Sequence, residues 1–424
     1  MRILYIVHQF WPEYSSGTER VTLNLAKAAQ RANHHVEVLT CSVGPAELWR
    51  NIGPNGWRHS SVHGIPVHGI PGNSISDPYG FNPGADTAVR EEIGRFLEAR
   101  NFDLVHVMHT MRMLDAVECV RARQIPYVMT LTDFFSMCYR VNLTRVQAGL
   151  CGGPVRAESC KTHCMAGEVT AQALDQRYVM LRDMLYGAED LIACSEFVAA
   201  TYAREFPNLP LRVIGHGIDL LRFRPPRPTV GDELVFGYLG ILADYKGVHV
   251  LAEAFTQAAP PNARLELIGG FKDSEIEKDL RRLVQCNKQV RLVDAIDAAA
   301  VPAALNGFDV NCLPALLPET FSLVLHEGFA AGVPPLASNI GNLGEVVSRS
   351  GCGRLVPPGD TAAWRDAITD IAAQPELLQN WRACLPLPLR QEEESFFYSQ
   401  IYKFAQHRQS RELGSDRLEE SGVD

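Results

Sequence analysis

The sequence contains no apolar run close to the roughly 20 residues that a membrane-spanning helix needs. Its opening, MRILYIVHQF, is apolar only briefly and lacks the long apolar core and cleavage site of a secretory signal peptide. Lys and Arg form no dense cluster and the formal net charge is −9, which is unlike a basic nucleic-acid-binding domain. These absences predict a cytoplasmic protein without a nucleic-acid partner, and they leave open peripheral attachment at the cytoplasmic face of a membrane.

Eleven cysteines without an export signal predict a reducing compartment, in which disulfides are rare and most thiols are small buried groups. Four of them gather in a Gly-rich insert over residues 138–164. Four thiols this close could form a tetrahedral zinc site that stiffens a segment with little core of its own. Free thiols and disulfides are the alternatives, and the spacing C-x12-C-x8-C-x3-C does not decide among the three. The thiols are those of Cys138, Cys151, Cys160 and Cys164.

With 424 residues the chain is too long for one core, so its length predicts two domains. Short apolar runs alternate with helix-length amphipathic stretches, which is typical of α/β layers around mostly parallel sheets. The run RFRPPRPTVGDE, at 222–233, is a Pro-rich linker. We predict an N-terminal domain over 1–219, a second domain over 220–389, a last helix over 390–407 and a disordered tail over 408–424.

Two carboxylates bracket a loop and a helix in the segment CLPALLPETFSLVLHEGFAAGVPPLASNIGNLGEV, residues 312–346. Glu319 lies at the end of the loop, and Glu327 lies inside a helix that is otherwise mostly apolar and is therefore expected to be buried. A buried carboxylate is costly without hydrogen-bond donors, and no Lys or Arg occurs between Cys312 and Ser348 to supply them. Donors to Glu327 must therefore come from elsewhere.

The start of this helix is suited to bind phosphate, because the free backbone N–H groups of its first turn attract anions. At about 1.5 Å per residue, Glu327 lies roughly 7 to 9 Å along the helix from that start. The spacing fits a ligand with a diphosphate at the helix start, one hydroxyl-rich group at Glu327 and another at Glu319. That ligand is a nucleotide-sugar. The N–H groups at the start belong to Thr320, Phe321, Ser322 and Leu323.

The spacing E-x7-E, set in PETFSLVLHEGFAAGVPPLAS, resembles the signature of retaining glycosyltransferases of family 4. These enzymes have the GT-B fold, in which two Rossmann-like α/β/α domains face each other across a cleft. The resemblance covers nearly the whole chain in order. It implies that Glu327 holds the nucleotide ribose, that Glu319 contacts the ring hydroxyls of the donor sugar, and that the last helix returns to the first domain.

Two further motifs carry the resemblance. SGTER opens a helix after the first strand, and in the family this loop binds the donor diphosphate by backbone N–H groups, here those of Gly17 and Thr18. GILADYKG carries Lys246, which in the family contacts the diphosphate, while Ile241 stands where the family usually has an arginine. Gly240 lies at a strand end, where a small residue lets a nucleotide approach the backbone.

The run FDLVHVMHT ends a buried strand at histidines, at the strand end where α/β folds place ligands. In the family a histidine here contacts the donor sugar. His106 occupies the common first position, and we expect His109 to have this role. TLTDFFSMCYR resembles the family run T-L-H-D-Y-W, with Asp133 retained and Thr132 in place of the histidine.

The resemblance implies a metal-independent enzyme of polysaccharide biosynthesis that needs no cofactor. It would move a hexose-type sugar from a nucleotide diphosphate-sugar to a glycan, lipid-linked or small-molecule acceptor. Lys246 and the helix start at 320–323 would stabilise the departing nucleotide diphosphate in place of a divalent metal. Two alternatives stay open: a nucleotide-sugar epimerase of the same fold, and a non-catalytic nucleotide-sugar binding protein, which the residues Ile241 and Thr132 suggest.

Overall fold

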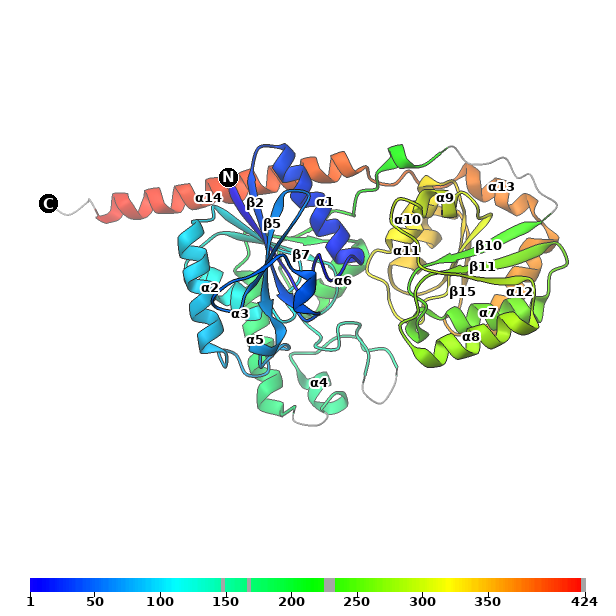
Figure 1. The fold of residues 1–424 in the computed structure, drawn as a ribbon, viewed down its shortest axis with the longest axis horizontal. Coiled ribbons are helices and arrows are strands. Elements are labelled where there is room, and N and C mark those ends of the chain that lie inside the picture. The colour runs from blue at the N-terminus through cyan, green and yellow to red at the C-terminus, as the bar shows by residue number, and fades with distance from the viewer. Residues whose placement is uncertain (146–148, 166–168, 225–232, 421–424) are drawn as a thin grey trace. The chain divides into compact units, whose positions relative to one another are not determined.

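The chain folds into two compact units, each built around a sheet of mostly parallel strands that helices cover (Figure 1). The first unit contains Met1–Gly215 and Glu392–Asp424, and the second contains His216–Gln391. The α/β prediction is confirmed, and the first boundary lies at Gly215 instead of residue 219. Most of the linker predicted at 222–233 lies outside the residues that the structure describes. The computed structural model describes residues 1–145, 149–165, 169–224 and 233–420, with the backbone alone over 407–420.

Among the described residues of the first unit, nine strands form one sheet in the order β3-β4-β5-β2-β1-β6-β7-β8-β9. Near its centre Ile3 of β1 lies opposite Val36 of β2 and Leu104 of β6, in parallel pairing. β1, β6 and β7 consist almost wholly of buried residues, as expected where helices cover both faces of a parallel sheet. The strands are β1 (Arg2–Val7), β2 (His35–Ser42), β3 (Asn51–Ile52), β4 (Arg58–Val62), β5 (Ile65–Pro71), β6 (Leu104–Val107), β7 (Tyr127–Leu131), β8 (Asp190–Ala193) and β9 (Leu211–Val213).

The helices of the first unit connect successive strands and cover the sheet. The helix α1 (Gly17–Arg31) buries Val21, Leu25 and Ala29, whose spacing of four places them on one helix face. No helix among the described residues of the chain is both long and apolar enough to cross a membrane. The other helical elements here are η1 (Ala46–Leu48), η2 (Gly72–Ser74), α2 (Thr87–Arg100), α3 (Leu114–Ala122), α4 (Glu158–His163), α5 (Ala171–Tyr186), α6 (Glu196–Glu205) and α14 (Gln391–Glu420).

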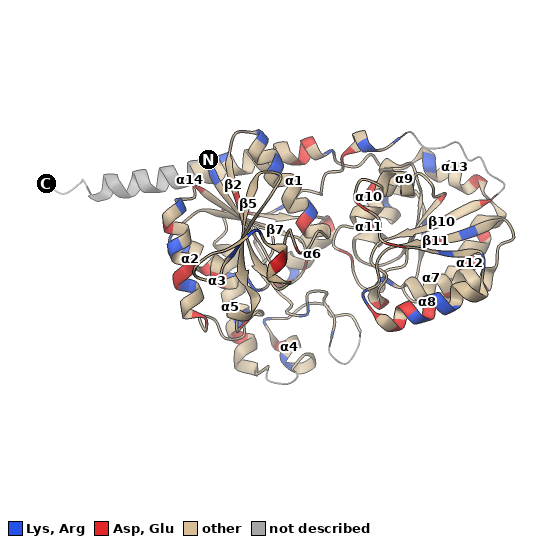
Figure 2. Cartoon of the chain, in the orientation of Figure 1, with Lys and Arg blue, Asp and Glu red and all other residues tan. Residues whose placement is uncertain are grey.

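In the described part of the second unit, six parallel strands form a sheet in the order β12-β11-β10-β13-β14-β15. Helices α7 and α12 pack together, and Phe255 and Trp364 are fully buried there. The helix α8 carries both acidic and basic residues (Figure 2). The strands are β10 (Leu234–Leu239), β11 (Ala263–Ile268), β12 (Val290–Val293), β13 (Val310–Leu313), β14 (Pro335–Ser338) and β15 (Arg354–Val356). The helical elements are η3 (Leu220–Arg222), η4 (Asp244–Lys246), α7 (Val248–Ala258), α8 (Ser274–Cys286), α9 (Val301–Leu305), α10 (Leu323–Ala330), α11 (Gly341–Ser350), α12 (Thr361–Ala373) and α13 (Glu376–Ala383).

The last helix, α14, supplies polar partners to the core of the first unit. The hydroxyl of Tyr402 lies 3.0 Å from that of Tyr5 and 2.7 Å from Nδ1 of His106. Nε2 of His106 lies 2.8 Å from the hydroxyl of Thr130, which in turn lies 2.9 Å from that of Tyr398. Burial lowers the pKa of His106 to about 3, so its neutral ring acts as one donor and one acceptor. This network ties α14 to β1, β6 and β7 of the first unit, the domain to which the sequence predicts that this helix returns.

The helix α14 is longer than the sequence predicts. A helix over 390–407 and a disordered tail over 408–424 are expected, whereas α14 runs from Gln391 to Glu420. The expectation relies on the scarcity of apolar residues in the tail. Its Arg, Glu and Leu residues are nevertheless good helix formers, and extending an existing helix needs no new nucleus. Residues 421–424 of the predicted tail lie outside the described residues.

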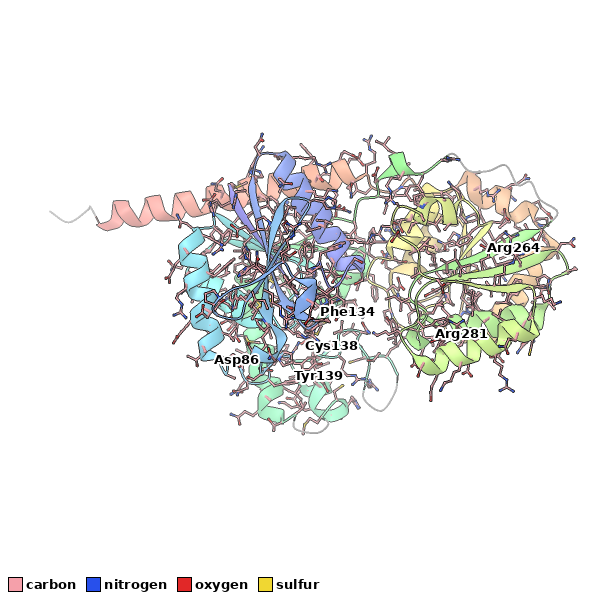
Figure 3. All side chains as sticks on the ribbon, in the orientation of Figure 1. Asp86, Phe134, Cys138, Tyr139, Arg264 and Arg281 are labelled. Atoms are coloured by element: carbon pink, nitrogen blue, oxygen red, sulfur yellow. The ribbon has the colours of Figure 1, made fainter. Side chains whose placement is uncertain are left out.

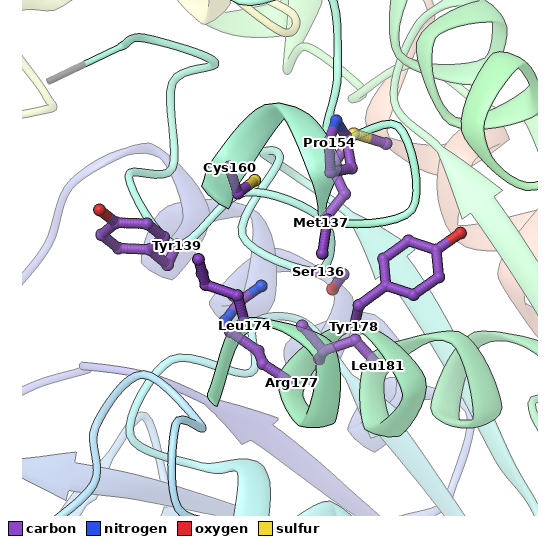
Figure 4. A pocket seen from close by; sticks show the side chains of 10 residues that line it. Ser136, Met137, Tyr139, Pro154, Cys160, Leu174, Arg177, Tyr178 and Leu181 are labelled. Carbon is purple, nitrogen blue, oxygen red and sulfur yellow. The ribbon is translucent and has the colours of Figure 1, made fainter. Parts of the chain in front are cut away.

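The cysteines in the insert of the first unit, residues 138–164, are free thiols in the part that the structure describes. Cys160 packs with Leu174 beside a small pocket that Arg177 also lines (Figure 4). Within the described residues, no three or more His, Cys, Asp and Glu side chains are grouped in a way that could hold a metal ion. The structure therefore describes these cysteines as free thiols, and the zinc alternative stays a prediction. They belong to Cys138 (Figure 3), Cys151, Cys160 and Cys164.

Tyr402→Phe removes the hydroxyl that satisfies Nδ1 of the buried His106. We expect the free energy of unfolding of the first unit to fall by about 1 to 3 kcal/mol, because a buried polar atom is left without its partner. Tyr186→Phe is the matched control, since it removes a hydroxyl that bonds the carbonyl of Pro207 at 2.7 Å on the exposed surface. Its cost should stay within about 0.5 kcal/mol. Urea unfolding measures both, and equal losses would contradict the role of the network.

Candidate active site

The second unit positions the two carboxylates of the E-x7-E motif on a loop and a helix. Glu319 lies in the loop between β13 and α10, and Ser322 ends this loop in a left-handed conformation with φ of 63°. The backbone N–H of Asn342, at the start of α11, donates to the carbonyl of Glu319 at 3.0 Å. Its side-chain amide donates to the carbonyl of Phe321 at 2.6 Å. The first turn of α11 therefore fixes the loop that leads into α10.

Glu319 forms an ion pair with Lys246, with 2.5 Å between Nζ and Oε1. Their side chains are 19% and 29% exposed, so the pair is partly shielded from water and still reachable by a ligand. Burial alone would raise the pKa of Glu319, but the ammonium of Lys246 and hydrogen bonds from Lys246 and Ser322 lower it. Burial alone would likewise lower the pKa of Lys246, and Glu319 raises it. Both groups are charged near neutral pH.

Glu327 is buried in α10, with 4% of its surface exposed, as the sequence predicts. The helix is fixed at this level because Gly328 packs directly on the side chain of Asn311 in β13. The amide of Asn311 also donates to the carbonyl of Val324 at 3.0 Å. Glu327 is therefore held in a rigid part of the unit, one helical turn beyond the first residue of α10, Leu323.

The predicted residues at the start of α10 lie in one turn: Thr320, Phe321, Ser322 and Leu323 precede or begin the helix. The ring of Phe321 stacks on that of His326, with 4.0 Å between centroids and 6° between planes. Burial lowers the pKa of His326 to about 4, so this stack is neutral at pH 7. Lys246 and the backbone N–H groups of this turn are thus positive groups that suit an anion here.

The loop that carries Lys246 follows β10 directly. Gly240 lies at its beginning, and its carbonyl oxygen would be 1.7 Å from a Cβ at Gly269, so only glycine fits there. Gly247 follows Lys246 with φ of 68°, against the carbonyl of Pro314 in the loop after β13. The two loops therefore meet backbone to backbone beside the ion pair.

In the first unit, polar residues gather where β1, β6 and β7 end. The rings of His8 and His109 are in contact, with 3.8 Å between centroids and their planes tilted by 31°, and Nε2 of His109 bonds Oδ2 of Asp133. Nδ1 of His109 accepts from the backbone N–H of Met111 at 3.1 Å. The proton of the neutral ring is therefore on Nε2, where it is donated to Asp133. Sequence reasoning predicted His109 but missed His8, whose one signal is its place directly after the first buried strand.

Glu19 connects this group to the loop of Gly17 and Thr18. Its carboxylate is fully buried, accepts from the hydroxyl of Ser16 and lies 3.9 Å from Nε2 of His8. Burial, with the nearby His109 and Arg112, holds the pKa of His8 well below its usual value. Gly17 and Thr18 begin α1, so they lie at the helix end whose backbone N–H groups favour anions.

The structure distinguishes the two histidines of the β6 segment. His106 is fully buried and bonded to Thr130 and to Tyr402 of α14, which leaves it no role in a binding site. His109 lies beyond the strand end, but both its ring nitrogens are already bonded, to Met111 and to Asp133. Its arrangement is that of a residue which orients a carboxylate.

Two family models match the chain in succession. Residues 15–222 match the model described as Glycosyltransferase Family 4, and residues 221–383 match the one described as Glycosyl transferases group 1. A curated relative, the phosphatidyl-myo-inositol mannosyltransferase of Mycobacterium leprae, is 29% identical over 207 residues, which are 47% of this chain and 52% of that protein. The chain spans about half the length of such curated relatives.

Solved structures of glycosyltransferases share the fold. The crystal structure of HepE from Anabaena in complex with UDP and glucose has a TM-score of 0.68 at 17% identity, covering 95% of this chain and 99% of that one. Sucrose-phosphate synthase from Thermosynechococcus elongatus has a TM-score of 0.69 at 22% identity, covering 95% and 98%. The likeness confirms the GT-B fold that the sequence predicts.

A double-mutant cycle on Lys246→Met and Glu319→Gln should give a coupling free energy of about 1 to 2 kcal/mol at pH 7 without ligand, because the pair is partly buried. The depressed pKa of Glu319 means that this coupling is present above the ordinary carboxyl pKa and is lost as the pH falls through the lowered value. The raised pKa of Lys246 means that it is also lost when the pH rises far into the alkaline range.

The control for this cycle is the pair of Arg281 (Figure 3) and Glu277 on α8, whose side chains are 55% and 38% exposed. Its coupling should be no more than about 0.5 kcal/mol. Urea unfolding of the two sets of variants measures both couplings. A value for Lys246 and Glu319 as small as that of the control would show that the pair does not hold the loops together.

Proposed function

Because the chain belongs to glycosyltransferase family 4, we propose that it is a retaining, metal-independent transferase that moves a hexose-type sugar from a nucleotide diphosphate-sugar to an acceptor. The acceptor would be a glycan, a lipid-linked molecule or a small molecule. The names of its relatives include a mannosyltransferase for phosphatidyl-myo-inositol and a glycogen synthase, so lipid and glycan acceptors both occur among them.

The observation that carries this proposal is the ion pair of Lys246 and Glu319 near the start of α10, together with the buried Glu327 one helical turn into that helix. A cation and the backbone N–H groups of a helix start at one end suit a diphosphate. Two carboxylates at different depths suit two groups of hydroxyls, because an ionised carboxylate accepts several hydrogen bonds. These three features together match the parts of a nucleotide-sugar.

In this proposal Glu327 accepts hydrogen bonds from the nucleotide ribose and Glu319 from the donor sugar. Lys246 and the N–H groups at the start of α10 stabilise the negative charge that builds up on the departing diphosphate, which is the part a divalent metal plays elsewhere. Gly240 lets the nucleotide approach the backbone. A donor that displaces Glu319 from Lys246 would take over a position that is already charged and oriented.

The first unit supplies groups suited to the other roles. Gly17 and Thr18, at the start of α1, present backbone N–H groups for phosphate. His109 holds Asp133, whose other oxygen accepts from the N–H of Phe135 at 2.8 Å. Asp133 is 24% exposed at its side chain and so can accept a hydrogen bond from a sugar or acceptor hydroxyl. The expected contact of His109 with the sugar would then be made through Asp133.

A thermal-shift panel with UDP-, GDP- and ADP-sugars, each against its free sugar, tests the proposed donor class. We expect one nucleotide family to raise the melting temperature in proportion to its affinity. Incubation with the donor that binds, and without acceptor, then separates the alternatives. Conversion of the donor into an epimeric nucleotide-sugar would favour the epimerase. A donor that is bound without hydrolysis or transfer to any acceptor would favour the binding protein.

The two carboxylates should respond differently to amide substitution. Glu327→Gln keeps the shape but gives up acceptor capacity, so the affinity for the bare nucleoside diphosphate should fall by roughly 1.5 to 3 kcal/mol, about tenfold or more. Glu319→Gln should leave that affinity nearly unchanged and weaken the intact donor and turnover instead. Calorimetric titration with both ligands measures this, with the melting temperature of each free variant as the control for folding. Equal nucleotide affinity in wild type and Glu327→Gln would end the ribose assignment.

A further inference from the structure

A second lysine, Lys272, lies in the loop next to that of Lys246 and was not predicted from the sequence. The Nζ atom of Lys272 stands 5.2 Å from the ring centroid of Tyr245, and Nζ of Lys246 stands 5.8 Å from the same centroid. Tyr245 is thus in contact with two ammonium groups. Both lysines belong to the second unit and lie where strands of its sheet end, after β10 and after β11.

The backbone fixes Lys272 to the loop of Lys246. Its N–H donates to the carbonyl of Leu242 at 3.1 Å, and the N–H of Leu242 donates to the carbonyl of Gly270 at 2.9 Å. Leu242 also forms a parallel bridge with Phe271. These bonds join the two loops as short extensions of β10 and β11. The positions of Lys246 and Lys272 are therefore set by the sheet itself.

The charge on Lys246 is largely offset in this site. Its ammonium is paired with the carboxylate of Glu319, so the pair as a whole adds little net charge to attract a diphosphate. The position where the family usually has an arginine holds Ile241, an apolar side chain that is 42% exposed. A diphosphate carries at least two negative charges, so a further cation beside Lys246 would strengthen its binding.

Lys272 has the properties of that cation. It is exposed, and the contact that fixes its ammonium is with an uncharged ring, which leaves the charge available to a ligand. The nearest carboxylate in sequence, Asp273, is engaged in capping α8, where it accepts from the N–H of Glu275 at 2.8 Å. Tyr245 limits the directions in which the flexible lysine side chain points.

We propose that Lys272 binds the diphosphate of the donor as the second cation beside Lys246 and so takes the place of the arginine that Ile241 replaces. This inference rests on the proposed function, since it assigns a further residue to the same donor site. It makes Lys272 a determinant of specificity for the diphosphate over the bare nucleoside. A lysine that is merely solvated would change the affinity for neither the diphosphate nor the nucleoside.

Lys272→Gln and Lys272→Arg test the assignment by calorimetric titration with a nucleoside and its diphosphate, uridine and UDP or the pair whose base binds in the thermal-shift panel. Lys272→Gln should weaken the diphosphate about five- to tenfold and leave the nucleoside unchanged, and the loss should shrink at high salt. Lys272→Arg should retain most of the affinity. Lys278→Gln, an exposed lysine of α8, is the matched control and should change neither ligand.

Each outcome of these titrations either supports or overturns the role of Lys272. Diphosphate binding in Lys272→Gln equal to wild type overturns the inference alone, while the proposed function stands on the binding of wild type. An equal loss for nucleoside and diphosphate also overturns it, because the residue then acts on the fold of the loop. A wild type that binds no nucleoside diphosphate overturns the proposed function and the inference together.

Discussion

The ion pair of Lys246 and Glu319 joins two loops that leave adjacent parallel strands of the second unit, β10 and β13. Backbone contacts run alongside it: the N–H of Leu316 donates to the carbonyl of Tyr245 at 3.0 Å, and Gly247 lies against Pro314. The pair keeps each charge compensated while it remains close to solvent. In the proposed function, a donor would meet these loops already in place, so little of its binding energy would be used to order them.

The same constraint, that every buried polar group needs a partner, shapes the first unit. His109 takes one hydrogen bond from the backbone and gives one to Asp133, which fixes both the tautomer and the direction of the ring. His8 packs against it in neutral form, because burial and the positive charge of the nearby Arg112 oppose its protonation. The carboxylate of Asp133 is thereby presented at the strand end with a defined orientation, which is how a rigid scaffold prepares a site.

Much of this could be predicted from the sequence because the signals are local. The alternation of apolar runs and amphipathic stretches gave the two α/β units, and one spacing located Glu319 and Glu327. What the sequence could not give depends on contacts between distant segments. His8 meets His109 because β1 and β6 are neighbours in the sheet, and Lys272 reaches Tyr245 because β10 and β11 are. The helical continuation of α14 was missed because composition reports apolar content and not whether a helix has already begun.

The position of α14 in the first unit has a consequence for how the chain is made. Strands β1, β6 and β7 leave the ribosome early, but the hydroxyls that satisfy His106 and Thr130 belong to Tyr402 and Tyr398, near the end of the chain. The whole second unit is synthesised in between. Domains usually fold as units in the order of synthesis. Here the second unit can complete its core first. The first unit cannot form the hydrogen bonds of His106 and Thr130 to α14 until that helix has been synthesised.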